Sequence, residues 1–172
     1  MRTIKNLLAT IALLFCSGTM DAYDFIVDGI YYDITSIEKL TVSVVNPANN
    51  VSIANSSPYE GDFVISSTVN FEGDIFTVTG IGRKAFFNGN ITSIVLPETL
   101  RRIESEAFYS NDELNSIIIP QNLEYIGPSA FDNCKKLKEI FFVGNNYPDT
   151  EYYTGAGETY PFDRTFAHSP RV

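Results

Sequence analysis

IGRKAF at residues 81–86 returns as IESEAF at 103–108 and again as IGPSAF at 126–131. The Ala-Phe pairs of these stretches are 22 and 23 residues apart. A regular period of this size, with apolar residues in register, is typical of a solenoid, in which each repeat stacks on the next. The sequence therefore predicts a β-rich solenoid, an architecture that presents a surface and makes an enzyme less expected.

A second element recurs with the same period between the Ala-Phe pairs. It reads IVLP at 94–97, IIIP at 117–120 and IFF at 140–142. Such short apolar runs, bounded by turn residues, predict strands. We expect three parallel strands, near 93–96, 116–119 and 139–142. Around the Ala-Phe pairs we expect one-turn helices, near 83–87, 105–109 and 128–132.

Parallel strands are about 4.8 Å apart, so equivalent side chains of successive repeats should lie above one another. Three buried columns follow from this spacing. The first contains Phe86, Phe108 and Phe131; the second contains Ile94, Ile117 and Ile140; the third contains Leu96, Ile119 and Phe142.

The residues before the repeats read as strands without the 23-residue period. Asp28-Gly29, between two apolar runs, is typical of a tight hairpin turn. Because the first layer of a solenoid has to be covered, we interpret residues 23–78 as an antiparallel β N-terminal cap. Residues 79–143 would be three repeats, and residues 144–172 an irregular C-terminal cap or a truncated repeat.

The first 18 residues have the features of a secretory signal peptide. Arg2 and Lys5 precede an uncharged apolar run at 7–15, and small residues follow, with cleavage conceivable up to residue 22. As a helix, nine residues span only about 14 Å, too little for a membrane of about 30 Å. We expect export to the extracellular space or the outer cell surface. A lipid anchor at Cys16 is the alternative, although bulky Phe15 precedes it.

Charge and cysteine content exclude several classes of protein. The chain has 12 Lys and Arg against 21 Asp and Glu, a net charge of −9 that becomes −11 when Arg2 and Lys5 are removed. A surface this acidic repels phosphate, so no nucleic-acid partner is expected. Without the signal peptide Cys134 is the single thiol, which excludes an intramolecular disulfide.

The usual catalytic and metal-binding residues are scarce. The single histidine is His168, close to the end of the chain, so a triad or zinc site is not expected. Glu104, Glu106, Asp112 and Glu113 lie close together in sequence, but a solvated edge of the solenoid explains them better than calcium binding or acid–base chemistry. We expect no catalytic residue, no cofactor and no metal.

The predicted strands do suggest a binding surface. Residues out of phase with the buried isoleucines should point outward. These candidate ligand-binding residues are Ser93, Val95, Ser116, Ile118, Glu139 and Phe141. Val95, Ile118 and Phe141 would form an exposed apolar column, unless the N-terminal hairpins or the C-terminal tail cover it.

The repeat resembles the BspA-like leucine-rich repeat. Residues 126–140 show the pattern best, in Ile126, Gly127, Ala130, Phe131, Cys134, Leu137 and Ile140. The opening residues 24–32 also look like the start of secreted members. Two departures are Glu104 in place of the glycine, and a cysteine position that only Cys134 fills.

The resemblance implies a leucine-rich-repeat right-handed β/α superhelix, exported to the bacterial surface and without catalytic residues. It also implies adhesion, to a surface protein or glycan of a host or neighbouring cell. The leading hypothesis is therefore a non-enzymatic binding module that uses its open strand face. The alternatives are a structural spacer or truncated remnant of a longer adhesin without its own ligand, and a secreted hydrolase, which would need two carboxylates converging in a cleft.

Overall fold

The computed structural model describes residues 23–48, 56–144 and 148–150. The expected signal peptide at 1–18, Cys16, and all of the expected C-terminal segment from 151 onward lie outside the described residues. The described residues form strands, and among them there is no helix that is long and apolar enough to cross a membrane. The strands are β1 (Phe25–Val27), β2 (Ile30–Ser36), β3 (Thr41–Val44), β4 (Glu60–Val64), β5 (Thr68–Phe71), β6 (Asp74–Ile81), β7 (Asn90–Val95), β8 (Arg102–Ile103), β9 (Ser116–Ile119), β10 (Tyr125–Ile126), β11 (Glu139–Phe142) and β12 (Asp149–Thr150).

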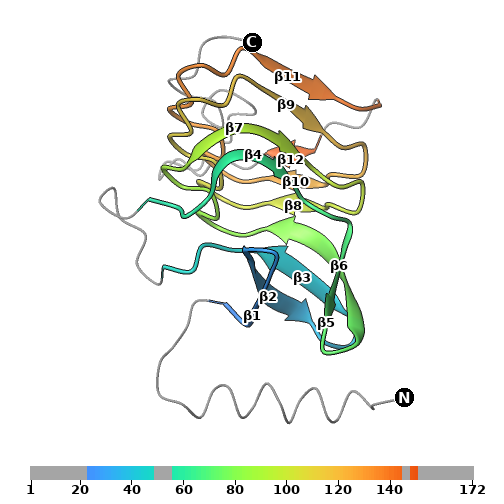
Figure 1. Cartoon of the computed structure of the whole chain (residues 1–172). Helices are drawn as coiled ribbons and strands as arrows, with labels where there is room; N and C mark the ends of the chain where they lie inside the picture. Colours follow the sequence, from blue (N-terminus) through green and yellow to red (C-terminus); the bar gives the residue numbers. More distant parts are fainter. Residues whose placement is uncertain (1–22, 49–55, 145–147, 151–172) are drawn as a thin grey trace, which may run out of the picture.

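The chain coils, and each coil, which we call a rung, lies on the one before it (Figure 1). Two sets of parallel strands connect the rungs. One set runs in the order β3-β6-β8-β10-β12. The other set consists of the parallel pairs β4-β7 and β9-β11, with β7 lying beside β9. The predicted solenoid with parallel strands is therefore confirmed.

The N-terminal region combines two kinds of pairing. β1, β2 and β3 pair antiparallel, as do β5 and β6, in agreement with the antiparallel structure predicted there. In contrast, β3 pairs in parallel with β6, and β4 pairs in parallel with β7, with Val64 opposite Val95. A strand from the region interpreted as a cap thus adds a row to the strand set of the repeats.

The predicted one-turn helices near 83–87, 105–109 and 128–132 are wrong. These segments are turns, and the described residues contain no helix. Two residues in each turn, four positions apart, have a positive φ, which interrupts any right-handed helix. They are Lys84, Asn88, Glu106, Ser110, Ser129 and Asn133, with φ between 50° and 59°.

Successive N–H groups in the turns donate alternately to the same rung and to the next rung. Every second N–H stays within its rung: Ala85 donates to the carbonyl of Gly82, 3.1 Å away. The others reach the next rung, and Phe86 donates to the carbonyl of Ala107 over 2.7 Å. The same alternation recurs one repeat later, where Phe108 donates to Ala130. The turns are therefore a third hydrogen-bonded ladder between rungs, and a helix would have used these donors internally.

The predicted aromatic column is confirmed. The rings of Phe86, Phe108 and Phe131 lie 4.9 and 5.1 Å apart, centre to centre, and each pair is parallel within 2°. Tyr59 extends the column toward the N-terminal region, with its ring centre 4.7 Å from that of Phe86. Its hydroxyl donates to the carbonyl of Val45, so Tyr59 connects the β3 end of the N-terminal region to the Phe86 ring of the first repeat.

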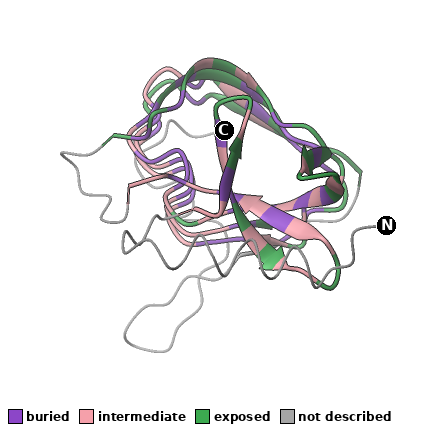
Figure 2. Cartoon of the chain, turned by 60° about the horizontal axis from the view of Figure 1, so that its bottom comes forward, coloured by how far each residue is buried: buried purple, intermediate pink, exposed green. Residues whose placement is uncertain are grey.

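The two predicted aliphatic columns also lie in the core. Buried residues gather on the inside of the coil and exposed residues on its outside (Figure 2). Ile94, Ile117, Leu96 and Ile119 are buried, whereas the members from β11, the last described strand of this set, are only partly buried.

One buried polar residue escaped the sequence analysis. Asn111 is fully buried at the position that Cys134 occupies one repeat later, three residues after the column phenylalanine. Its amide nitrogen donates to the carbonyls of Phe86 (2.7 Å) and Phe108 (2.8 Å), and its oxygen accepts from the N–H of Ile91 (3.4 Å). The first rung has Gly89 there, where an added Cβ would lie 2.9 Å from the Asn111 oxygen. The larger amide therefore requires a glycine below it.

Phe108→Ala should lower the free energy of unfolding by about 3–5 kcal/mol, because the ring is covered on both sides and its loss leaves a cavity. Urea denaturation followed by circular dichroism measures this change. Ile118→Ala, on an exposed position nearby, serves as the control and should change stability by about 0.5 kcal/mol or less. Equal denaturation midpoints for the wild type and Phe108→Ala would contradict a core role for the column.

Asn111→Ala should cost about 1–3 kcal/mol, because it removes the hydrogen-bond partner of the buried Ile91 N–H and two donors to carbonyls. Asn111→Cys should cost less, since the thiol of Cys134 donates to the Phe108 carbonyl one repeat later, over 3.1 Å. The same denaturation assay compares the two variants. If both lose the same stability, the hydrogen bonds of this position do not matter.

Candidate functional site

The outward side of β4, β7, β9 and β11, which we call the strand face, carries a line of exposed apolar side chains. Strand pairing puts Val64 opposite Val95 and Phe141 opposite Ile118. Their exposed fractions are 69%, 57%, 52% and 57%, respectively. We call these four residues the apolar column. Singly exposed apolar residues are ordinary, but these four lie on successive strands and form one line of apolar side chains.

A second line of side chains lies two residues earlier on each strand. We call it the polar column, and its members are Asp62, Ser93, Ser116 and Glu139. Thr92 and Ser93 both donate to one carboxylate oxygen of Asp62, each over 2.6 Å. These two hydrogen bonds hold the pKa of Asp62 below its ordinary value, so the carboxylate stays charged at neutral pH.

All six candidate residues from the sequence lie on this face. Val95, Ile118 and Phe141 are exposed, as predicted, as are Ser93 and Glu139, while Ser116 is partly buried and bonded to the Asn115 side chain. Val64 and Asp62 were missed because β4 lies outside the 23-residue period. A signal was present: Phe63-Val64-Ile65 resembles Ile94-Val95-Leu96 in alternation.

The strand face is small. Four strands about 4.8 Å apart and about four residues long present on the order of 250 Å². A standard protein interface takes about 800 Å² from each partner. The face therefore fits a partner segment better than the flat surface of a whole domain.

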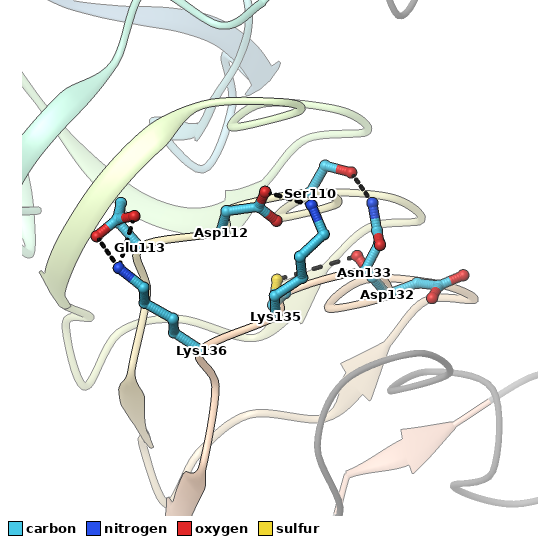
Figure 3. A network of polar contacts seen from close by, with 8 residues as sticks. Ser110, Asp112, Glu113, Asp132, Asn133, Lys135 and Lys136 are labelled. Atoms are coloured by element: carbon cyan, nitrogen blue, oxygen red, sulfur yellow. Dashed lines mark hydrogen bonds and ion pairs between the residues drawn. The ribbon is translucent and has the colours of Figure 1, made fainter.

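The four carboxylates considered for calcium binding or acid–base chemistry are each paired with a cation. Glu104 is 2.9 Å from Arg102, and Glu106 contacts both Arg83 and Lys84. Asp112 and Glu113 pair with the lysines one rung above, over 2.6 and 2.7 Å (Figure 3). Exposed pairs of this kind contribute little stability, and each carboxylate has a neighbouring cation as its partner, as expected of a solvated edge of the solenoid.

Two further features bear on reactive chemistry in the described part of the chain. No group of three or more His, Cys, Asp and Glu side chains there lies close enough to hold a metal ion. The Cys134 thiol is buried, and burial raises its pKa to about 12, which keeps it protonated and unreactive. His168 lies outside the described residues.

Comparisons with solved structures find the same architecture in bacterial proteins. A leucine-rich repeat protein from Bacteroides ovatus is 31% identical over 69% of this chain, with a TM-score of 0.57, and this chain spans 29% of its length. A leucine-rich repeat protein from Bacteroides capillosus is 22% identical, with 70% of this chain and 98% of that chain covered and a TM-score of 0.56. A leucine rich cell surface protein from Faecalibacterium prausnitzii is 23% identical, with 73% and 31% covered and a TM-score of 0.54.

A comparison with curated proteins found no match. A comparison with protein families, in contrast, identifies the type of repeat. Residues 66–148 match the protein family described as "BspA type Leucine rich repeat region (6 copies)". This range includes the Ala-Phe turns and three of the four strands of the strand face. Residues 66–148 of this chain are therefore a leucine-rich-repeat region of the BspA type.

Proposed function

We propose that this chain is a non-enzymatic binding module that recognises a protein through its strand face. The observation that carries the proposal is the apolar column, whose four members are each 52–69% exposed on one side of the solenoid. The interior requires apolar residues only at the alternate, buried positions. Four apolar residues on the outward positions therefore call for an explanation other than folding.

The chemistry of the face favours a protein over a glycan. Sugars are commonly bound on aromatic rings, and Phe141 is the single aromatic residue among the eight residues of the two columns. Aliphatic side chains instead match the apolar centre of protein interfaces. The tyrosines of the C-terminal segment lie outside the described residues and do not enter this argument.

We also propose that the protein is exported and displayed at the cell surface, where its partner would be a protein of a host or neighbouring cell. Two observations support this. The first 18 residues combine basic residues with a short apolar run. The similar Faecalibacterium prausnitzii protein is described as a cell surface protein.

A second candidate function is a spacer within a larger surface protein. It is favoured by the small strand face and by the Bacteroides ovatus protein, of whose length this chain spans 29%. A spacer has no ligand of its own, so substitutions on the strand face would leave all its properties unchanged.

Phe141→Ala should weaken partner binding by at least about 1–2 kcal/mol, because it is the largest side chain of the apolar column and aromatic residues dominate interface hot spots. The partner is first captured from host-matrix and neighbouring-cell extracts with the purified chain, and affinity is then measured by biolayer interferometry. Because Phe141 is half exposed, the melting temperature should hardly change.

Ile75→Ala is the matched control, since Ile75 is 60% exposed but lies on β6, away from the strand face. It should bind as the wild type does. If Phe141→Ala loses stability while its binding is intact, Phe141 is a folding contact and the proposal fails. If every captured partner binds both variants equally, the spacer function is favoured.

A further inference from the structure

We propose that the strand face receives an amphipathic α-helix of the partner, which lies across the strands along the apolar column. The inference rests on the proposed function, because it names the kind of partner segment that this face accepts. Three properties of the face carry it: the spacing of the column, its area and the charge beside it.

The spacing of the apolar column matches a helix. Val64 is paired with Val95 and Ile118 with Phe141, and β7 lies beside β9 without strand hydrogen bonds. With a spacing of about 4.8 Å at each step, the members lie at about 4.8, 9.6 and 14.4 Å from the first. Helix positions i, i+3, i+7 and i+10 share one face and rise by about 4.5, 10.5 and 15 Å. Each apolar residue of such a helix therefore meets one row, with a mismatch of about 1 Å or less.

An extended peptide fits this face less well. Its side chains on one side are about 6.8 Å apart, so three of them span the same length and fall out of phase with four rows. Moreover, the strand backbones hydrogen-bond within the plane of the sheet, β4 with β7 and β9 with β11. A peptide lying on the face would gain no ladder of backbone hydrogen bonds, the main source of affinity in strand addition.

The area of the face also suits a helix. A helix is about 10 Å wide and covers about 15 Å with ten residues, which corresponds to most of the roughly 250 Å² that the face presents. The face is too small for a domain-sized interface of about 800 Å² per partner. A helix that contacts the face through its apolar stripe can therefore cover most of this small surface.

The charge beside the column specifies one flank of the helix. Asp62 and Glu139 lie two residues before Val64 and Phe141, so both acids are on the same side of the column, three rows apart. β4, β7, β9 and β11 contain no Lys or Arg. Three rows correspond to about ten residues of helix. The partner helix should therefore carry Lys or Arg near both ends of one flank of its apolar stripe.

The test uses synthetic 15-residue peptides and the full chain. The first peptide places Leu at i, i+3, i+7 and i+10 with Lys along one flank. Its controls have the same design with a central proline, the same composition rearranged so that Leu and Lys alternate, and Glu in place of Lys. Fluorescence anisotropy measures affinity, and circular dichroism measures the helicity of the bound peptide.

We expect the helical peptide to bind at least tenfold more tightly than the proline and alternating controls, and more weakly as salt increases. Ile118→Asp, at the centre of the column, should weaken this binding at least tenfold, whereas Ile75→Asp should change it less than twofold. Glu139→Lys should weaken binding of the Lys peptide and strengthen binding of the Glu peptide. A reversed preference of this kind cannot come from misfolding.

Other results separate this inference from the proposed function. If the alternating peptide binds as tightly as the helical one and Ile118→Asp weakens it, the helix is wrong and the strand face still binds protein. If neither Ile118→Asp nor Glu139→Lys changes the affinity for the helical peptide, the inference fails and the proposed function is weakened with it. If no peptide binds, the inference is overturned, and capture with Phe141→Ala judges the proposed function separately.

Discussion

The distance between rungs is the constraint on which the rest of this structure depends. Parallel strands hold it near 4.8 Å, and the rings of Phe86, Phe108 and Phe131 stack at almost the same distance, 4.9 and 5.1 Å. Backbone pairing and ring stacking therefore require the same distance between rungs. Because the rings are parallel, a rung that tilted or slipped would lose contact with both its neighbours.

The turns obey the same constraint, and this explains their unusual backbone. Each turn has a positive φ at two residues four positions apart, and every second N–H is directed at the rung above, as when Phe86 donates to Ala107. The turn residues are thus paired across rungs as strand residues are. Positive φ is costly for residues other than glycine, so the inter-rung hydrogen bonds have to offset that strain.

The interior leaves the outward positions free to vary, and the proposed function resides there. Buried Ile94 and Ile117 alternate with exposed Val95 and Ile118 on the same strands. The core uses only the first pair, so the second pair is available for recognition. Rung spacing then sets the spacing of whatever the face presents, which is why the core geometry bears on the shape of a partner.

The sequence by itself determined the solenoid, its period, the phenylalanine column and most of the strand face. These follow from the identity and alternation of residues within a repeat, which are local properties. Only the tertiary structure decided the turn conformation, because Lys84 and Glu106 adopt positive φ and donate their N–H groups to the neighbouring rung. It also decided the place of β4. This strand lies in a segment without the 23-residue period, and its pairing with β7 is not visible in the sequence pattern.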